Sequence, residues 1–319
     1  MYYNLNGIPS AAPVEENYFV VFNGHDFSLK DGDLTYDIDG LCVRLHHAFA
    51  DKIFGSVQEY YKLMPYLNAL ITSAGLDPEA NISKDDFATL VLKLETNETF
   101  NRLMYYHDCK NLISTLQNSV SETKYLLGKF YETLNRNSFL LSEIIQQPET
   151  VIMASGIVTT NIYSIINSLF INLYSQLDFI SKTIYEIEHI VTDFKKYPKL
   201  KSSKILFGGA NQTSLYNVPD TLLVPSNPTI KTIVNLRNEL VHNASFENHP
   251  RVYIVIKEER VVEKFILLPD MEEGNIKSFR NRNRFFHDEV KLNEILPELI
   301  KDFWKKLKYT LDLVIIDKQ

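Results

Sequence analysis

A seven-residue repeat of apolar side chains in the middle of the chain most constrains the fold. Large aliphatic residues occupy every seventh position within residues 100–145, at Ile113, Val120, Leu127, Leu134 and Leu141. A second position of the repeat is filled in part by Leu116, Phe130 and Ile144. Because this period places the side chains on one side of a helix, the segment predicts a long helix packed lengthwise in a bundle core.

Other segments have weaker but consistent patterns. Apolar spacing predicts further helices over residues 41–71, around 88–94 after a capping Ser83, over 151–194, and over 292–316. The 151–194 segment is apolar nearly all round, so we expect it at the centre of the bundle. Strands are predicted at residues 18–22 and, as a hairpin, at 251–257 and 261–268.

These elements predict a mainly α fold, an up-and-down helical bundle with a small β-hairpin insertion near residues 251–268. We expect two regions: residues 1–99, an acidic N-terminal segment with accessory helices, and residues 100–319, the bundle itself. The first region is acidic because residues 1–40 hold seven Asp or Glu and a single Lys. By subtraction from the total of −7, the rest of the chain carries about −1, which leaves room for local basic patches.

The remaining composition predicts a reduced, cytoplasmic protein. The two cysteines, Cys42 and Cys109, lie far apart and have no metal-binding spacing around them. The N-terminus lacks a basic region followed by an apolar run, and no apolar run approaches the roughly 20 residues of a membrane span. We therefore expect no signal peptide, no membrane partner, no metal and no cofactor.

One short segment, residues 226–248, has clear start and stop signals for a helix. Asn227 is suited to the N-cap and Pro228 to the first helical position. An apolar stripe is predicted at helical spacing from Ile230, Ile233, Val234, Leu240 and Val241. Arg237 falls on this stripe, where a cation is costly unless it is paired or lies in a polar site. Asn238 follows directly, and His242 lies near the expected end of the helix.

The residues Arg237, Asn238 and His242 resemble the Arg-x4–6-His signature of the HEPN superfamily (higher eukaryotes and prokaryotes nucleotide-binding). The resemblance covers this helix and, loosely, the helices around it. It implies a helical bundle that pairs into dimers and, in many members, metal-independent RNase activity at the dimer cleft. Similar spacings occur at Arg102…His107 and at Arg280 or Arg282…His287. We prefer Arg237 because it combines the capped helix, the apolar stripe and an abrupt helix end.

The resemblance also implies roles for these side chains. Histidine can act as a base or an acid near neutral pH, and arginine offers paired N–H donors to phosphate. We therefore expect His242 to act as general base or acid, Arg237 to hold the phosphate, and Asn238 to orient Arg237 or the phosphate by hydrogen bonding. Asp178 is expected to pair with Arg237 or to orient His242, with a solvent-facing position as an equal alternative. The expected product is a 2′,3′-cyclic phosphate.

A second segment, residues 277–287, combines basic and aromatic side chains. Three Phe residues alternate with four cations, namely Lys277, Arg280, Arg282 and Arg284. Cations for phosphates beside rings that stack on bases are typical of single-strand nucleic-acid binding. The alternative interpretation is a charged surface over a docked aromatic cluster.

The sequence therefore predicts a HEPN-like endoribonuclease that forms a homodimer and binds RNA. A role as a toxin with an antitoxin partner, or as a phage-defence effector, is compatible with this prediction. The alternative function is a non-catalytic HEPN-like module that dimerises or binds a nucleotide or a partner. In that interpretation Arg237 forms a structural ion pair with Asp178 or Glu239, and His242 satisfies the last carbonyls of its helix.

Overall fold

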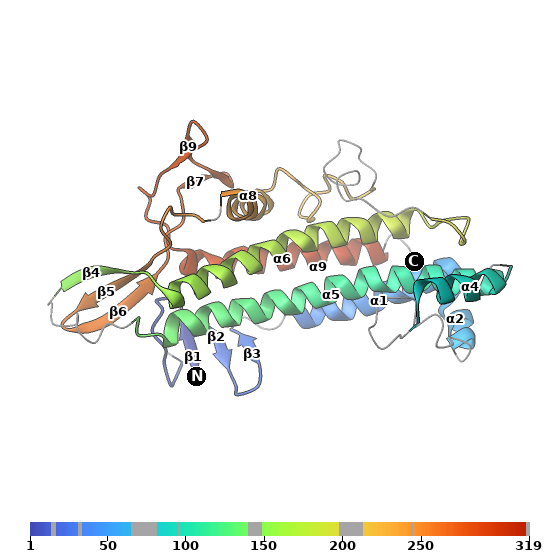
Figure 1. Ribbon diagram of the computed structural model, residues 1–319, viewed down its shortest axis with the longest axis horizontal. Coiled ribbons are helices and arrows are strands. Elements are labelled where there is room, and N and C mark those ends of the chain that lie inside the picture. Colours follow the sequence, from blue (N-terminus) through green and yellow to red (C-terminus); the bar gives the residue numbers. More distant parts are fainter. Residues whose placement is uncertain are drawn as a thin grey trace.

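The computed structural model describes residues 1–13, 17–30, 34–64, 82–94, 96–139, 149–197, 213–243 and 245–316. The described chain is mainly helical and carries small antiparallel sheets, as the sequence predicts. The longest helices lie side by side and form an elongated bundle (Figure 1): α1 (Leu34–Phe54), α5 (Glu98–Arg136), α6 (Ile157–Glu188) and α9 (Leu292–Ile316).

The predicted heptad helix forms the centre of this bundle. Asn97 begins α5, because its side-chain oxygen accepts a hydrogen bond from the backbone of Phe100 at 3.1 Å. The heptad residues Ile113, Val120, Leu127 and Leu134 are all buried. Helix α5 ends at Arg136, earlier than predicted, and Leu141 lies outside the described residues.

The helix order of the bundle differs from a strict up-and-down arrangement. Helix α5 packs along α6 and α1, and α1 packs along α9. Ion pairs between Asp37 and Lys308 and between Arg44 and Asp312 show that α1 and α9 run in the same direction. In Figure 1 α9 starts at the end of the bundle where α6 begins, so that α6 and α9 also run in the same direction.

A polar contact fixes α5 against α6 within this apolar core. Gln176 is fully buried, and its amide donates to the Thr123 hydroxyl at 2.7 Å and to the Ser119 carbonyl at 3.2 Å. Gln176 is one of the polar interruptions of the predicted central helix. It therefore faces α5 rather than a functional site.

A three-stranded antiparallel sheet projects from one end of the bundle (Figure 1). Strands β5 (Val252–Lys257) and β6 (Arg260–Phe265) form the predicted hairpin. Strand β4 (Glu149–Ala154) pairs with β5 along its whole length. The prediction that a helix begins at residue 151 is wrong here, because the pairing with β5 overrides the local pattern and α6 begins only at Ile157.

The predicted helix over residues 41–71 is also divided. Helix α1 ends at Phe54, and Gly55 takes a positive φ of 87°. Ser56 then caps a separate short helix, α2 (Val57–Leu63), while residues 65–71 lie outside the described residues. A further short helix, α4 (Lys84–Leu94), follows the predicted cap Ser83.

The N-terminal sheet contains β1 (Tyr2–Asn4), β2 (Tyr18–Phe22) and β3 (Phe27–Leu29), and it lies against α5. A Cβ at Gly128 of α5 would lie 2.2 Å from the Phe27 ring, so the close approach requires glycine there. Buried apolar side chains from both predicted regions join one cluster. The boundary between residues 99 and 100 remains a prediction.

Helix α8 (Pro228–Asn243) crosses the outside of the bundle and contacts α6 and α9. In Figure 1 it is seen end-on while α6 lies across the view. Two small hairpins lie near it, formed by β7 (Met271–Glu272) with β8 (Asn275–Ile276) and by β9 (Ser278–Phe279) with β10 (Asn283–Arg284). The turn at Gly274 closely approaches the start of α8, since a Cβ there would lie 2.5 Å from the Pro228 carbonyl.

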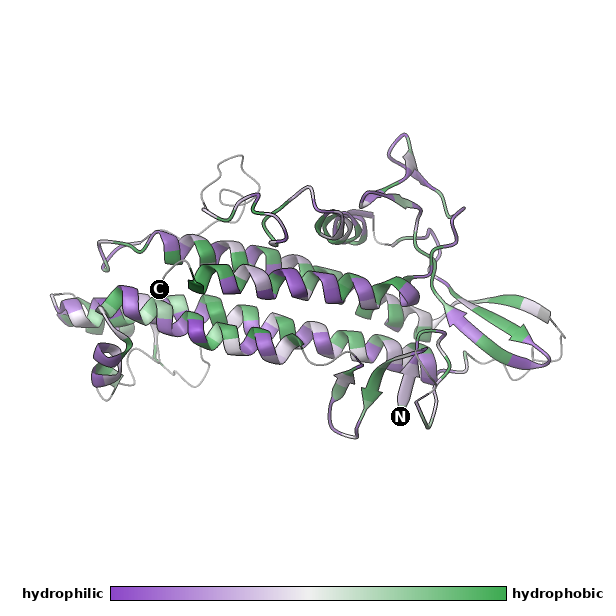
Figure 2. Ribbon diagram, turned by 180° about the vertical axis from the view of Figure 1, so that it is seen from behind, coloured by the Kyte–Doolittle hydropathy of each residue, from purple (hydrophilic) through white to green (hydrophobic). Residues whose placement is uncertain are grey.

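The hydropathy of the helices matches this packing. Hydrophobic and hydrophilic positions alternate around the long helices, as expected when one face of each is buried (Figure 2). Within the described ranges, no helix combines the length and the apolar character that crossing a membrane requires.

Candidate functional site

Helix α8 starts and ends as its sequence predicts. The Asn227 side chain accepts a hydrogen bond from the Thr229 backbone at 3.0 Å, and Pro228 occupies the first position. The buried face consists of Ile230, Ile233, Leu236 and Leu240. Val241, predicted to lie on the apolar stripe, is 45% exposed.

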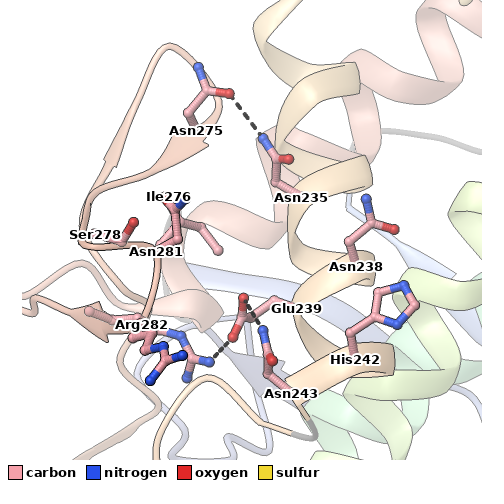
Figure 3. A pocket seen from close by; sticks show the side chains of 11 residues that line it. Asn235, Asn238, Glu239, His242, Asn243, Asn275, Ile276, Ser278, Asn281 and Arg282 are labelled. Atoms are coloured by element: carbon pink, nitrogen blue, oxygen red, sulfur yellow. Dashed lines mark hydrogen bonds and ion pairs between the residues drawn. The ribbon is translucent and has the colours of Figure 1, made fainter.

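The opposite face of α8 lines a pocket of about 350 Å³ (Figure 3). The α8 wall contains Asn235, Asn238, Glu239, His242 and Asn243. The facing wall comes from the two small hairpins and contains Asn275, Ile276, Ser278, Asn281, Arg282 and Arg284. The lining is therefore strongly polar, and five of its residues are asparagine. Amide groups can donate and accept hydrogen bonds, which suits a polar or anionic ligand.

His242 and Asn238 lie one helical turn apart on the same side of α8 (Figure 3). His242 is exposed, and among the described residues its ring has no hydrogen-bond partner. The bond to the last helix carbonyls, considered above as an alternative, is therefore not formed within this part of the chain. Both ring nitrogens are available to exchange a proton with a ligand in the pocket.

Arg237 points away from the pocket. Its guanidinium carbon lies 4.5 Å from the ring centre of Tyr174 on α6, in a cation–π contact. Its Nη1 donates to the Asn238 side-chain oxygen at 2.9 Å, and its buried Nε has no hydrogen-bond partner among the residues that the structure describes. Burial and the nearby Asp178 raise the pKa of the Tyr174 hydroxyl, while Arg237 opposes that shift. The structure therefore does not place Arg237 and His242 in one pocket of a single chain.

Asp178 lies one turn beyond Tyr174 on α6, and one of its carboxylate oxygens is buried and has no hydrogen-bond partner in the described part of the chain. Between the described residues, no hydrogen bond or ion pair joins Asp178 to Arg237 or to His242. The interaction seen for Asp178 is therefore with Tyr174, whose pKa it helps to raise, and Tyr174 in turn contacts Arg237.

Arg284 joins the two walls of the pocket. Its guanidinium forms an ion pair with Glu239 of α8. The same side chain donates to the carbonyls of Ser245 and Phe246, each at 2.9 Å, and burial lowers its pKa. These partners give Arg284 a structural role in place of the phosphate contact expected from the sequence. They also give Glu239 a partner other than Arg237.

The other cations of the 277–287 segment are arranged differently. Lys277 forms an ion pair with Asp288 at 3.3 Å, and the Arg280 guanidinium lies 5.0 Å from the centre of the Phe279 ring. Neither lines the pocket. Arg282 is exposed, lines the pocket and has no acidic partner among the described residues. It is therefore the cation best placed to meet an anion beside His242.

The alternative Arg-x-His copies lie elsewhere. Arg102 of α5 forms an ion pair with Glu98 of the same helix and donates a hydrogen bond to the Ile53 carbonyl of α1. The pKa of His107 is lowered, chiefly by burial. His287 is exposed and does not line the pocket, although Arg282 of the same copy does. Asn235, Asn275 and Asn281 line the pocket but were not predicted as site residues. The near-helical spacing of asparagines at 235, 238 and 243 was a sequence signal for a polar face of α8.

The described residues contain no group of three or more His, Cys, Asp or Glu side chains arranged to hold a metal ion. Cys42 and Cys109 are buried free thiols. Comparison with known proteins does not assign the chain: no family model, no curated protein and no solved structure matches it.

Proposed function

We propose that this protein is a HEPN-like endoribonuclease that cleaves RNA without a metal ion at the α8 pocket. The observation that carries the proposal is the shared pocket of His242, Asn238 and Arg282, which offers an imidazole, an amide and a guanidinium without an acidic partner among the described residues. These are the groups needed to move a proton and to bind the charge of a phosphodiester.

The reaction is a transesterification. His242 takes the proton of a ribose 2′-hydroxyl, and the 2′-oxygen forms a bond to phosphorus. The bond from phosphorus to the 5′-oxygen breaks, and a second imidazole protonates that leaving oxygen. The products are a 2′,3′-cyclic phosphate and a 5′-hydroxyl. Because the pocket contains one histidine per chain, a homodimer would supply the second imidazole as His242 of the other copy.

Arg282 and Asn238 stabilise the phosphate in this scheme. The guanidinium of Arg282 donates to phosphate oxygens whose charge grows in the transition state. Asn238 donates through its amide NH2 group, because its side-chain oxygen already accepts from Arg237. Arg237 is thus a positioning residue that is itself held against Tyr174.

The test is cleavage of labelled RNA in EDTA by the wild-type chain, by His242→Ala and by His249→Ala. His249 is also exposed but does not line the pocket, so its variant controls for the loss of a surface histidine. We expect wild type and His249→Ala to cleave, and His242→Ala to lose activity by roughly 10²- to 10⁴-fold, the usual contribution of a general acid or base. Equal activity of the two variants would contradict the proposal.

A second function, RNA or nucleotide binding without cleavage, is favoured by one observation. The motif arginine, Arg237, lies against Tyr174 and does not line the pocket, so the pocket contains the motif histidine without the motif arginine. Saturable binding of RNA that stays intact under all conditions would support this function. Growth arrest on expression, relieved by His242→Ala, would favour a toxin with an antitoxin partner or a phage-defence effector.

A further inference from the structure

A second pocket, of about 370 Å³, adjoins the α8 pocket. The two share Arg282 and Arg284 in their walls. Both volumes fall in the range of about 300–1,000 Å³ that is usual for small-ligand sites. An extended ligand can therefore enter both pockets while passing Arg282.

The two pockets differ in chemistry. The α8 pocket has no Phe, Tyr or Trp in its lining, whereas the second pocket has three such residues, Phe246, Tyr253 and Phe286. Two of these rings are fixed by neighbours. Phe246 is fully buried against Phe170 of α6, and Tyr253 is stacked on Phe265 with ring centres 5.3 Å apart. Because Phe246 is fully buried, the rings open to a ligand are those of Tyr253 and Phe286, which are partly exposed. Unstacked bases of RNA stack on such aromatic side chains, while phosphates require cations and amides.

The second pocket also contains a buried carboxylate. Glu247 is 8% exposed, and its Oε2 accepts a hydrogen bond from the Tyr253 hydroxyl at 3.3 Å. The Tyr163 hydroxyl lies 3.4 Å from Oε1 and shares its one proton with the Arg251 carbonyl, at 3.2 Å. The nearest cation, Arg251, lies 3.8 Å from one oxygen. An ionised carboxylate has about four acceptor positions, so both oxygens retain capacity for further donors.

The surroundings of Glu247 make added donors favourable. Burial raises the pKa of its carboxyl, and the two tyrosines and Arg251 offset this only in part. Two parallel N–H groups from a ligand would supply the missing stabilisation of the ionised form. Guanine is the RNA base whose Watson–Crick edge presents two adjacent donors, at N1 and at the 2-amino group.

We infer that the second pocket is a guanine-binding subsite, and that the preferred substrate is single-stranded RNA with a guanosine next to the phosphate held by Arg282. In this arrangement the base stacks within the aromatic lining and donates to Glu247, while the adjoining phosphate lies between Arg282 and the α8 pocket. This inference rests on the proposed function for the identity of the α8 pocket, but base recognition can be measured without cleavage.

The experiment uses labelled oligouridine strands with 2′-O-methyl groups, which cannot undergo the transesterification. One central position is guanosine, inosine or adenosine, and binding to the full chain is followed by fluorescence anisotropy. We expect the guanosine strand to bind about 5- to 150-fold more tightly than the adenosine strand, the usual range for a paired hydrogen-bond contact to a base. Inosine, which lacks the 2-amino group, should fall between them.

The matched variants are Glu247→Gln and Glu258→Gln. Glu258 is an exposed acid in the turn of the β5–β6 hairpin, so its variant makes the same change of charge outside the pocket. We expect Glu247→Gln to bind the guanosine and adenosine strands equally and Glu258→Gln to keep the preference. If Glu247→Gln fails to fold, the wild-type comparison of guanosine with inosine decides alone.

The outcomes separate this inference from the proposed function. Equal wild-type binding of all three strands would overturn the subsite even if RNA is cleaved at His242. A guanosine preference in a chain that never cleaves RNA would support the subsite and remove the catalytic proposal. Competition by GMP as strong as by the guanosine strand would overturn the assignment to RNA and point to free guanine nucleotides.

Discussion

Arg237 and His242, five residues apart on α8, lie on different faces of that helix. Arg237 packs over Tyr174 of α6, whereas His242 lines the pocket beside Asn238. The hydrogen bond from Arg237 to Asn238 is the connection between the two faces. Arg237 therefore acts on the proposed chemistry indirectly, through the orientation of one amide.

This connection predicts non-additive effects on RNA cleavage. Arg237→Lys keeps the charge but loses the planar fork, so it should lower the cleavage rate about as much as Asn238→Ala, roughly 10-fold for one hydrogen bond to a charged group. The double variant should be no slower than either single variant. The measurement is kcat for all three against wild type; multiplicative losses would show that Arg237 and Asn238 act independently.

The pair Arg284 and Arg282 predicts opposite effects on stability and binding. Arg284→Ala leaves Glu239 and two carbonyls without their donor, so unfolding in urea should become easier by about 3 kcal/mol. Arg282→Ala should change the free energy of unfolding by less than about 0.5 kcal/mol, because its side chain is exposed. Only Arg282→Ala should weaken RNA binding in a folded chain. Similar stability losses in both variants would contradict these assignments.

Two glycines in helices predict opposite responses to alanine. A Cβ at Gly128 would lie 2.2 Å from the Phe27 ring, whereas one at Gly40 of α1 meets nothing within 4 Å. Gly40→Ala should stabilise the fold by up to about 1 kcal/mol through helix propensity. Gly128→Ala should destabilise it by about 1–3 kcal/mol through overpacking. Urea unfolding measures both, and a stabilising Gly128→Ala would show that the N-terminal sheet does not pack on α5 as described.

His46 predicts a loss of stability in acid. Burial, assisted by Lys110, lowers the pKa of its imidazole to about 4 from an unfolded value near 6.5. The unfolded chain therefore binds more protons between these values, and this contribution to stability is present above pH ~6.5 and lost as the pH falls towards 4. Unfolding free energies at pH 7 and pH 5 should differ less in His46→Gln than in wild type. If this difference between pH 7 and pH 5 is the same in His46→Gln as in wild type, the folded protein does not lower the pKa of His46.

Local signals in the sequence were sufficient for several elements. The cap at Asn227, the proline at position 228 and the apolar spacing predict α8 correctly, since each depends on residues close in the chain. The heptad repeat predicts α5 for the same reason. Strand β4 was missed because its partner β5 lies about 100 residues further on, and only that pairing distinguishes it from a helix start.

The site was harder to predict because its contacts join distant segments. Periodicity correctly placed Arg237 on the buried stripe, but it could not supply Tyr174 as the group that receives the guanidinium. The basic, aromatic segment around Arg284 predicts a phosphate contact, but its guanidinium binds Glu239 and the Ser245 carbonyl, which are distant in the sequence. Charge and residue type predict which groups are available, whereas their partners are set by tertiary packing.

The most direct test of the central claim is the chemical identity of the new ends after the protein is incubated with RNA in EDTA. We expect fragments that end in a 2′,3′-cyclic phosphate and begin with a 5′-hydroxyl, formed by the wild-type chain and absent with His242→Ala. Intact RNA, or fragments with a 3′-hydroxyl and a 5′-phosphate, would contradict the claim that His242 transfers the proton when the ribose 2′-hydroxyl attacks the phosphodiester.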